Sequence, residues 1–145
     1  MKPYFSEDGI TIYHGDCREI LPSLGIEPDL TIADPPYAQT SLKWDRWPDG
    51  WLSLPLGRSL WCFGSLRLFM DRAGEFATAG WRLSQDVIWE KHNGSGFASD
   101  RFKRVHEQAA HFGSGQVSLH MQRFCIGMQS ASQCFFAPGS SADQR

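Results

Sequence analysis

Four consecutive residues, Asp34-Pro35-Pro36-Tyr37, carry the most distinctive chemistry in the sequence. They follow the apolar run Leu30–Ala33, which predicts a β-strand. Each proline fixes φ near −65° and lacks an N–H, so the chain should form a rigid corner after this strand. The Asp34 carboxylate and the Pro35 carbonyl can accept both hydrogens of an amino group on a flat ring, and Tyr37 offers a face for stacking. An ordinary turn is the alternative, since Asp and Pro are common turn residues.

A second carboxylate, Asp16, follows residues 10–13, whose β-branched and aromatic side chains predict another strand. Asp16 and Glu19 form a D-x-x-E capping pattern, which predicts a short helix that begins at Cys17 and is ended by Pro22. An N-cap needs no ligand. A carboxylate just after a strand also lies where open α/β sheets bind nucleotides, so both roles stay open for Asp16.

Three tryptophans, Trp44, Trp47 and Trp51, lie close together in the irregular segment 38–58. An indole combines a large stacking face with a polar N–H, so these residues are candidates for a lid over a ring bound at the Asp34 corner. Packing of the tryptophans under the loop is the commoner alternative.

The rest of the pattern alternates strands with helices. Residues 59–63 predict a strand, and residues 81–83, 86–91 and 108–112 predict further extended chain. The clearest helix begins at Leu66 and ends near Gly80, and its apolar positions predict a core-facing stripe of Leu66, Phe69, Met70, Ala73, Phe76 and Ala77. This order of elements predicts an α/β fold with a mostly parallel sheet.

Positive charge is concentrated in one segment of the chain, although the net charge of the whole chain is slightly negative. The chain of 145 residues has a formal net charge of −2, so it is not a polycation that binds nucleic acid by bulk charge. Between Lys91 and His106, however, there are four cations against one acid, Asp100; the cations are Lys91, Arg101, Lys103 and Arg104. These four side chains are candidate contacts to DNA phosphates, and a solvated basic turn is the alternative.

The cysteine spacing and the lengths of the apolar stretches predict the cellular compartment and the metal content. The four cysteines form no C-x-x-C pair and show no zinc-ligand spacing, so we expect neither a metal site nor disulfides and place the protein in a reducing cytoplasm. No stretch approaches the ~20 apolar residues of a membrane-spanning helix. We therefore expect no membrane association.

The last part of the chain has a different character. From 113 to 145 only Arg123, Asp143 and Arg145 are charged, Ser and Gln are abundant, and no period is sustained. We therefore expect two regions: residues 1–112 as a structured unit and residues 113–145 as an atypical tail that is either disordered or altered by a frame change.

The ordered series of motifs resembles the DNA amino-methyltransferases, in the β-type arrangement where the catalytic half precedes the cofactor half. The resemblance covers about residues 10–112, and its motifs are His14-Gly15-Asp16-Cys17, Leu21-Pro22-Ser23-Leu24, Asp34-Pro35-Pro36-Tyr37, Phe63-Gly64-Ser65, Ile88-Trp89-Glu90-Lys91 and Arg104-Val105-His106-Glu107.

The resemblance implies a Rossmann-like, S-adenosylmethionine-dependent methyltransferase fold acting on double-stranded DNA. Residues 34–37 would form the catalytic motif, and Asp at its first position favours adenine N6 over cytosine N4. Asp16 and Cys17, together with Asp34, would contact the cofactor. The loop from Lys91 to Arg104 would lie in or beside the target-recognition region. Methyl transfer to the amine of a flipped base would be direct, without a metal.

Two family segments have no counterpart in the sequence: H-P-x-x-K-P and the strand ending in D-P-F-x-G-S-G-T, whose glycines cradle the cofactor. We therefore expect a copy truncated before the cofactor glycine motif, with a mobile element such as a prophage as its source. The alternatives are a non-catalytic DNA-binding remnant and a cytosine N4-methyltransferase.

Overall fold

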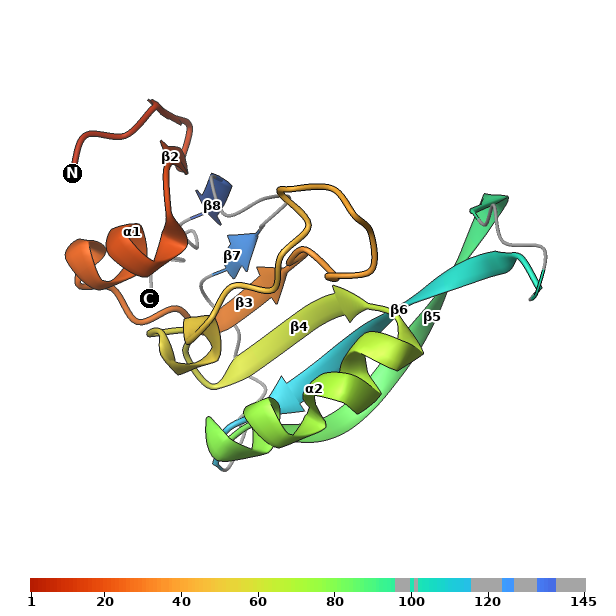
Figure 1. Ribbon diagram of the computed structural model, residues 1–145. Helices are drawn as coiled ribbons and strands as arrows, with labels where there is room; N and C mark the ends of the chain where they lie inside the picture. The colour runs from red at the N-terminus through yellow and green to blue at the C-terminus, as the bar shows by residue number, and fades with distance from the viewer. Residues whose placement is uncertain (96–99, 101, 116–123, 127–132, 138–145) are drawn as a thin grey trace, which may run out of the picture.

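A single mixed β-sheet with helices packed against it forms the body of the protein (Figure 1). The structure is a computed structural model, and it describes residues 1–95, 100, 102–115, 124–126 and 133–137. In chain order the elements are β1 (Phe5–Glu7), β2 (Ile10–His14), α1 (Cys17–Leu24), β3 (Leu30–Ala33), the 3₁₀-helix η1 (Trp51–Ser53), β4 (Ser59–Gly64), α2 (Leu66–Thr78), β5 (Arg82–Ser95), β6 (Arg104–Gly113), β7 (Phe124–Ile126) and β8 (Gln133–Ala137).

The described strands are ordered β1-β2-β8-β7-β3-β4-β6-β5 across the sheet. The predicted α/β class is confirmed, but the expected predominance of parallel pairing is wrong. Among these strands only β3–β4 and β3–β7 pair in parallel, and the other five pairs are antiparallel. Three of these pairs, β1–β2, β5–β6 and β7–β8, join consecutive strands whose short connections permit only antiparallel pairing. The pairs β2–β8 and β4–β6 join strands that are distant in sequence, and the tertiary fold sets their direction.

Helix α1 begins as predicted but ends later than predicted. Asp16 is its N-cap and accepts a hydrogen bond from the backbone N–H of Arg18. The helix continues through Pro22 and ends at Leu24, before Gly25 at φ 59°. The prediction that Pro22 ends the helix is therefore wrong. Proline removes one N–H donor, and the helix ends only two residues later, so few backbone bonds depend on that position.

Helix α2 has the predicted position, and Ala79 and Gly80 end it, with Gly80 at φ 86°. Its buried face agrees with the predicted stripe at Phe69 and Phe76 and differs from it elsewhere. Leu68 and Phe76 are buried and Phe69 is half-buried, whereas Leu66 and Met70 are 61% and 71% exposed. Ala73 and Ala77 are also exposed. Both stripes have helical spacing, so the periodicity alone does not distinguish them and tertiary packing decides.

One hydrophobic cluster unites α1, η1, α2 and the central strands. It contains Ile20 of α1, Trp51 of η1 and Phe76 of α2, and Leu60 and Cys62 of β4 are fully buried in it. Phe76 stacks on Phe112 of β6 with ring centroids 4.1 Å apart. This cluster covers one face of the sheet and fixes the position of β3, which leads into the Asp34 corner.

The segment between η1 and β4 is tied to β3 by close backbone contacts. The buried Thr31 hydroxyl donates to the carbonyl of Leu56 over 2.8 Å. Gly57 has φ 73°, and a Cβ built there would lie 1.9 Å from the carbonyl oxygen of Pro28. Glycine is therefore required at position 57, both for its backbone angle and for this approach.

The region 113–145, which the sequence sets apart, contains the end of β6 and the two short strands β7 and β8. Strand β7 pairs in parallel with β3, and β8 pairs with β2 and β7. Ser114 and Gly115 follow β6 and are also described, and the backbone N–H of Ser114 donates to the carbonyl of Arg58. Residues 116–123, 127–132 and 138–145 lie outside the described residues. None of the described helices has the length and apolar character needed to span a bilayer.

Candidate functional site

The Asp34 corner forms directly at the carboxyl end of β3. Ala33, the last residue of the strand, is buried, as are Pro35 and Pro36, while Asp34 and Tyr37 are half-buried. The two prolines anchor the corner in the protein and leave the Asp34 carboxylate and the Tyr37 ring at its surface. The predicted position of this corner, directly after a strand, is confirmed.

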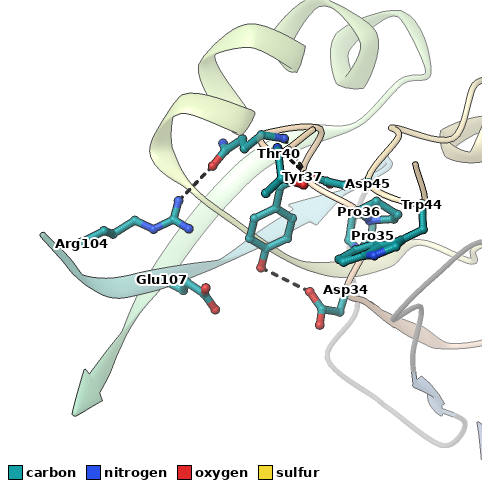
Figure 2. A pocket seen from close by; sticks show the side chains of 10 residues that line it. Asp34, Pro35, Pro36, Tyr37, Thr40, Trp44, Asp45, Arg104 and Glu107 are labelled. Carbon is teal, nitrogen blue, oxygen red and sulfur yellow. Dashed lines mark hydrogen bonds between the residues drawn. The ribbon is translucent and has the colours of Figure 1, made fainter. Parts of the chain in front are cut away.

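A cleft of about 410 Å³ opens beside this corner. Figure 2 shows Trp44 and the prolines on one side and the side chains of Arg104 and Glu107 on the other, with Asp34 and Tyr37 between them. The volume lies in the range of small-molecule sites, about 300–1,000 Å³. The lining residues are Asp34, Pro35, Pro36, Tyr37, Gln39, Thr40, Trp44, Asp45, Arg104 and Glu107.

Asp34 sits in a mixed electrostatic environment. Its Oδ1 accepts a hydrogen bond from the Tyr37 hydroxyl over 3.2 Å. Burial raises the pKa of the Asp34 carboxyl above its ordinary value, and the charge of Glu107 adds to this, while the Tyr37 hydrogen bond and the charge of Lys91 oppose it. Burial also raises the pKa of Tyr37, and the negative charges of Asp34 and Glu107 add to that rise. Tyr37 therefore remains a hydroxyl donor at neutral pH.

The loop after Tyr37 is folded around one buried carboxylate. Asp45 is 3% exposed and accepts hydrogen bonds from the backbone N–H groups of Ala38, Gln39 and Thr40 and from the Thr40 hydroxyl, at 2.7–3.0 Å. Burial opposes ionisation of Asp45, but the bonds it accepts outweigh burial and hold the pKa of this carboxyl below its ordinary value. Asp45 thus closes residues 38–45 into a fixed loop beside the cleft.

The opposite wall of the cleft comes from the distant strand β6. Arg104 donates to the side-chain oxygen of Gln39 over 3.0 Å, and Gln39 also contacts the Ser65 hydroxyl. Glu107 forms an ion pair with Lys91 of β5 at 2.7 Å. Glu107 therefore lines the cleft while its carboxylate is paired with the ammonium group of Lys91.

Two of the four predicted DNA contacts have protein partners. Lys91 is paired with Glu107, and Arg104 is bound to Gln39 at the rim of the cleft. Lys103 is exposed. Arg101 lies outside the described residues. The structure therefore brings Arg104 to the Asp34 corner and leaves Lys103 on the surface.

Asp16 and Cys17 do not line the cleft. The Asp16 carboxylate caps α1 and forms an ion pair with the guanidinium of Arg18 at 2.5 Å. Its hydrogen bond to the Arg18 side chain lowers the pKa of Asp16. Cys17 is 1% exposed and belongs to the hydrophobic cluster. The capping role of Asp16 is confirmed, and the predicted cofactor contacts of Asp16 and Cys17 stay predictions.

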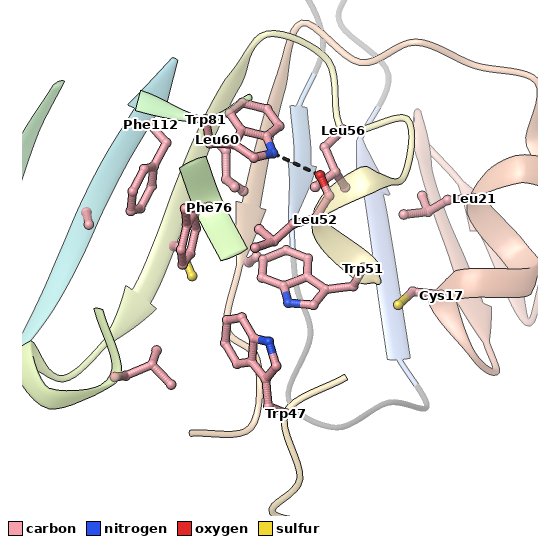
Figure 3. Packing of buried hydrophobic residues seen from close by; sticks show 14 of the residues in the cluster. Cys17, Leu21, Trp47, Trp51, Leu52, Leu56, Leu60, Phe76, Trp81 and Phe112 are labelled. Atoms are coloured by element: carbon pink, nitrogen blue, oxygen red, sulfur yellow. Dashed lines mark hydrogen bonds between the residues drawn. The ribbon is translucent and has the colours of Figure 1, made fainter. Parts of the chain in front are cut away.

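Of the three tryptophans in segment 38–58, two pack in the core and one lies at the cleft, so each of the two interpretations from the sequence applies to part of the group. Trp47 and Trp51 are 7% and 1% exposed and pack against each other edge to face in the core (Figure 3). The indole N–H of Trp47 also donates to Glu75 over 2.7 Å. Trp44 is 58% exposed and lines the cleft. Core packing thus explains two of the three, and Trp44 is the one at the site.

Sequence reasoning assigned no role to Asp45, Gln39 or Glu107, although all three line the cleft. Glu107 belongs to Arg104-Val105-His106-Glu107, one of the motifs that carry the family resemblance. Its neighbours in sequence gave no signal that it would line the same cleft as Asp34. Its position depends on the sheet order β3-β4-β6. Within the described residues, no group of three or more His, Cys, Asp or Glu side chains is arranged to hold a metal ion.

The fold is similar to that of two solved structures of one protein. The crystal structure of the M1.HpyAVI-SAM complex matches with a TM-score of 0.55 and 22% sequence identity, covering 73% of this chain and 55% of the other. The crystal structure of M1.HpyAVI matches with a TM-score of 0.52 and 21% identity, covering 70% of this chain and 55% of the other. The chain thus spans about half the length of M1.HpyAVI. No family model and no curated protein matches this chain.

At these identities the likeness shows a shared fold. The expectation of an α/β fold is confirmed, and the fold is shared in part with that of M1.HpyAVI.

Proposed function

We propose that this chain is the catalytic half of an S-adenosylmethionine-dependent DNA methyltransferase that modifies the N6 amine of adenine. The observation that carries the proposal is the Asp34 carboxylate, presented with the Pro35 carbonyl at the carboxyl end of a β-strand and open to a cleft. Two further observations support it: the ordered motif series in the sequence, and the fold shared with M1.HpyAVI, one of whose crystal structures is a complex with SAM.

Asp34 acts by holding and orienting the amine. The Tyr37 hydrogen bond goes to Oδ1, and no other hydrogen bond to this carboxylate comes from the described residues. Oδ2 therefore remains available to one N–H of the amine, and in the proposed function the carbonyl of Pro35, a residue that lines the cleft, accepts the other. With both hydrogens held, the nitrogen lone pair points away from the protein groups and toward the methyl donor. The carboxylate also stabilises the positive charge that develops on the nitrogen.

The residues present fit a cationic cofactor. When bound, S-adenosylmethionine would supply an electrophilic methyl group on a positively charged sulfur. The carbon–nitrogen bond would form as the carbon–sulfur bond breaks, the sulfur would leave as a neutral thioether, and the amine would lose one proton to solvent. Of the three carboxylates that line the cleft, Asp45 is bound to backbone N–H groups and Glu107 is paired with Lys91. Asp34 is therefore the carboxylate left to face a cationic group. The cleft also lies at the carboxyl end of β3, which pairs in parallel with β4 and β7, and open α/β sheets bind ligands outside such strand ends. Asp16 remains the candidate contact to the adenosine part.

In this proposal, double-stranded DNA is contacted by the basic segment from Lys91 to Arg104, whose end lies at the cleft. Lys103 is exposed and Arg104 stands at the rim, so both can reach phosphates around a base that has left its stack. Lys91 is a weaker candidate for a phosphate contact, because its positive charge is largely neutralised by the ion pair with Glu107.

Transfer of a labelled methyl group from S-adenosylmethionine to DNA tests the proposal directly. Wild-type protein should label DNA, and Asp34→Ala should abolish labelling. Asp71→Ala is the matched control, because Asp71 is exposed on α2 and forms only a surface ion pair with Arg67. Mass analysis of the digested nucleosides should find N6-methyladenine; N4-methylcytosine would replace the adenine assignment.

Calorimetric titration with S-adenosylmethionine separates an enzyme from a DNA-binding remnant. An enzyme should bind the cofactor and bind it more weakly in Asp16→Ala. Binding of DNA without any cofactor binding or methyl transfer would overturn the proposed activity and leave the remnant.

A further inference from the structure

Trp44 is unusual among the residues of the cleft because it is large, apolar and mostly exposed. It is 58% exposed, while Trp47 and Trp51 in the same segment are 7% and 1% exposed. Its indole lies beside Pro35 and Pro36 at the mouth of the cleft (Figure 2). The protein therefore places one tryptophan of this segment against solvent at the site while it buries the other two.

Tyr37 is less free to serve as the main stacking surface. Its hydroxyl is committed to Asp34, and its ring is half-buried and packs against the hydrophobic cluster. Part of the Tyr37 ring surface is therefore already taken up by the protein. The exposed aromatic face at the cleft is that of Trp44.

The loop that carries Trp44 is held in place from both sides. Asp45, the next residue, binds three backbone N–H groups and the Thr40 hydroxyl, which ties it to residues 38–40. On the other side, the Arg46 guanidinium donates to the carbonyls of Leu42 and Asp45 at 3.2 and 3.0 Å. The backbone N–H of Arg46 also donates to the carbonyl of Trp44 over 2.9 Å. A surface that is fixed before binding loses less entropy when a ligand stacks on it.

We propose that Trp44 is the surface on which a nucleobase extruded from DNA stacks, and that Asp45 is the positioning residue that holds Trp44 at the cleft. This inference rests on the proposed function, since it takes the ring that enters the cleft to be a nucleobase. Asp34 and the Pro35 carbonyl grip the amine edge of the base, and Trp44 covers its face. Stacking is tolerant of sequence, so Trp44 strengthens binding of any base, and selection falls to the groups on the amine edge.

The test measures binding of two single strands of equal length, an oligodeoxyadenylate and an abasic strand, at one salt concentration and without cofactor. Both strands carry the same phosphates, so the ratio of the two affinities isolates the bases. Trp44→Ala should weaken binding of oligodeoxyadenylate by roughly 5- to 100-fold, the loss expected for one stacked base, and leave the abasic strand unchanged. Trp44→Phe should retain most of the affinity.

Trp89→Ala is the matched control, because Trp89 is 60% exposed on β5 but does not line the cleft. It should leave the ratio of affinities as in wild type. Asp45→Asn should reduce the ratio in the same direction as Trp44→Ala; a purely structural role would weaken both strands equally. Thermal unfolding confirms that each variant is folded. An unchanged ratio in Trp44→Ala overturns the inference.

The two proposals fail separately. Methyl transfer that persists with an unchanged affinity ratio in Trp44→Ala overturns the stacking role alone. A ratio that depends on Trp44 in a chain that transfers no methyl group overturns the enzymatic proposal and supports the stacking role.

Discussion

The Tyr37 hydroxyl donates to Oδ1 of Asp34 over 3.2 Å, and this one hydrogen bond fixes the orientation of a half-buried carboxylate. The bond favours the ionised form of Asp34, but burial outweighs it and the pKa of Asp34 is raised. Keeping this carboxylate ionised at neutral pH therefore costs folding free energy. Functional sites commonly carry such a cost.

Asp34→Asn should consequently raise stability at pH 7. A carboxyl with a raised folded-state pKa contributes its full stability below the unfolded value of 3.8 and loses it as the pH rises through the folded value. Asparagine does not titrate and can still accept from Tyr37. The melting temperature of Asp34→Asn should exceed that of wild type at pH 7, and the difference should shrink toward pH 3.8. A lower melting temperature at pH 7 would contradict this explanation.

The ion pair of Lys91 and Glu107 should tune the pKa of Asp34 in opposite directions. Glu107→Gln removes a negative charge and should lower the pKa of Asp34, and Lys91→Met removes a positive charge and should raise it. Carboxyl titration by nuclear magnetic resonance measures both shifts. Glu90→Gln is the control, since Glu90 is exposed and outside the cleft. Shifts of the same sign in the two variants would show that the pair acts by shape rather than charge.

Asp45→Ala should destabilise the protein by about 2–3 kcal/mol, because it leaves three backbone N–H groups without their charged acceptor. Denaturant unfolding measures the change. The pKa of Asp45 is lowered on folding, so its contribution is present above pH 3.8 and is lost as the pH falls through the folded value. Asp49→Ala, at an exposed position nearby, should change stability by less than about 0.5 kcal/mol. Equal losses in the two variants would exclude a special role for Asp45.

Two glycines should respond oppositely to alanine. Gly57→Ala places a Cβ against the Pro28 carbonyl at a positive φ and should cost at least ~2 kcal/mol or prevent folding. Gly74 lies within α2, and a Cβ there meets nothing within 4 Å. Gly74→Ala should stabilise the protein by up to about 1 kcal/mol. Thermal and denaturant unfolding of both variants checks the pair, and a neutral Gly57→Ala would show that the β3–β4 connection adapts.

The sequence by itself determined the features that depend on neighbours along the chain. The strands at 10–14, 30–33 and 59–64, the cap at Asp16, the end of α2 near Gly80 and the corner at Asp34 all follow from local spacing and backbone restriction. These short-range signals were enough to place a carboxylate at the end of a strand in an α/β fold.

The tertiary structure decided everything that joins distant segments. Local periodicity allowed two faces of α2 that share Phe76, and packing buried Leu68 in place of Leu66 and Met70. Sheet order, which no local pattern encodes, brought Glu107 and Arg104 of β6 to the cleft of Asp34 and placed β4 beside β6 and β2 beside β8 as antiparallel pairs. The same packing buried Trp47 and Trp51 and left Trp44 at the site, because a side chain's burial depends on what lies across from it and not on its neighbours in sequence.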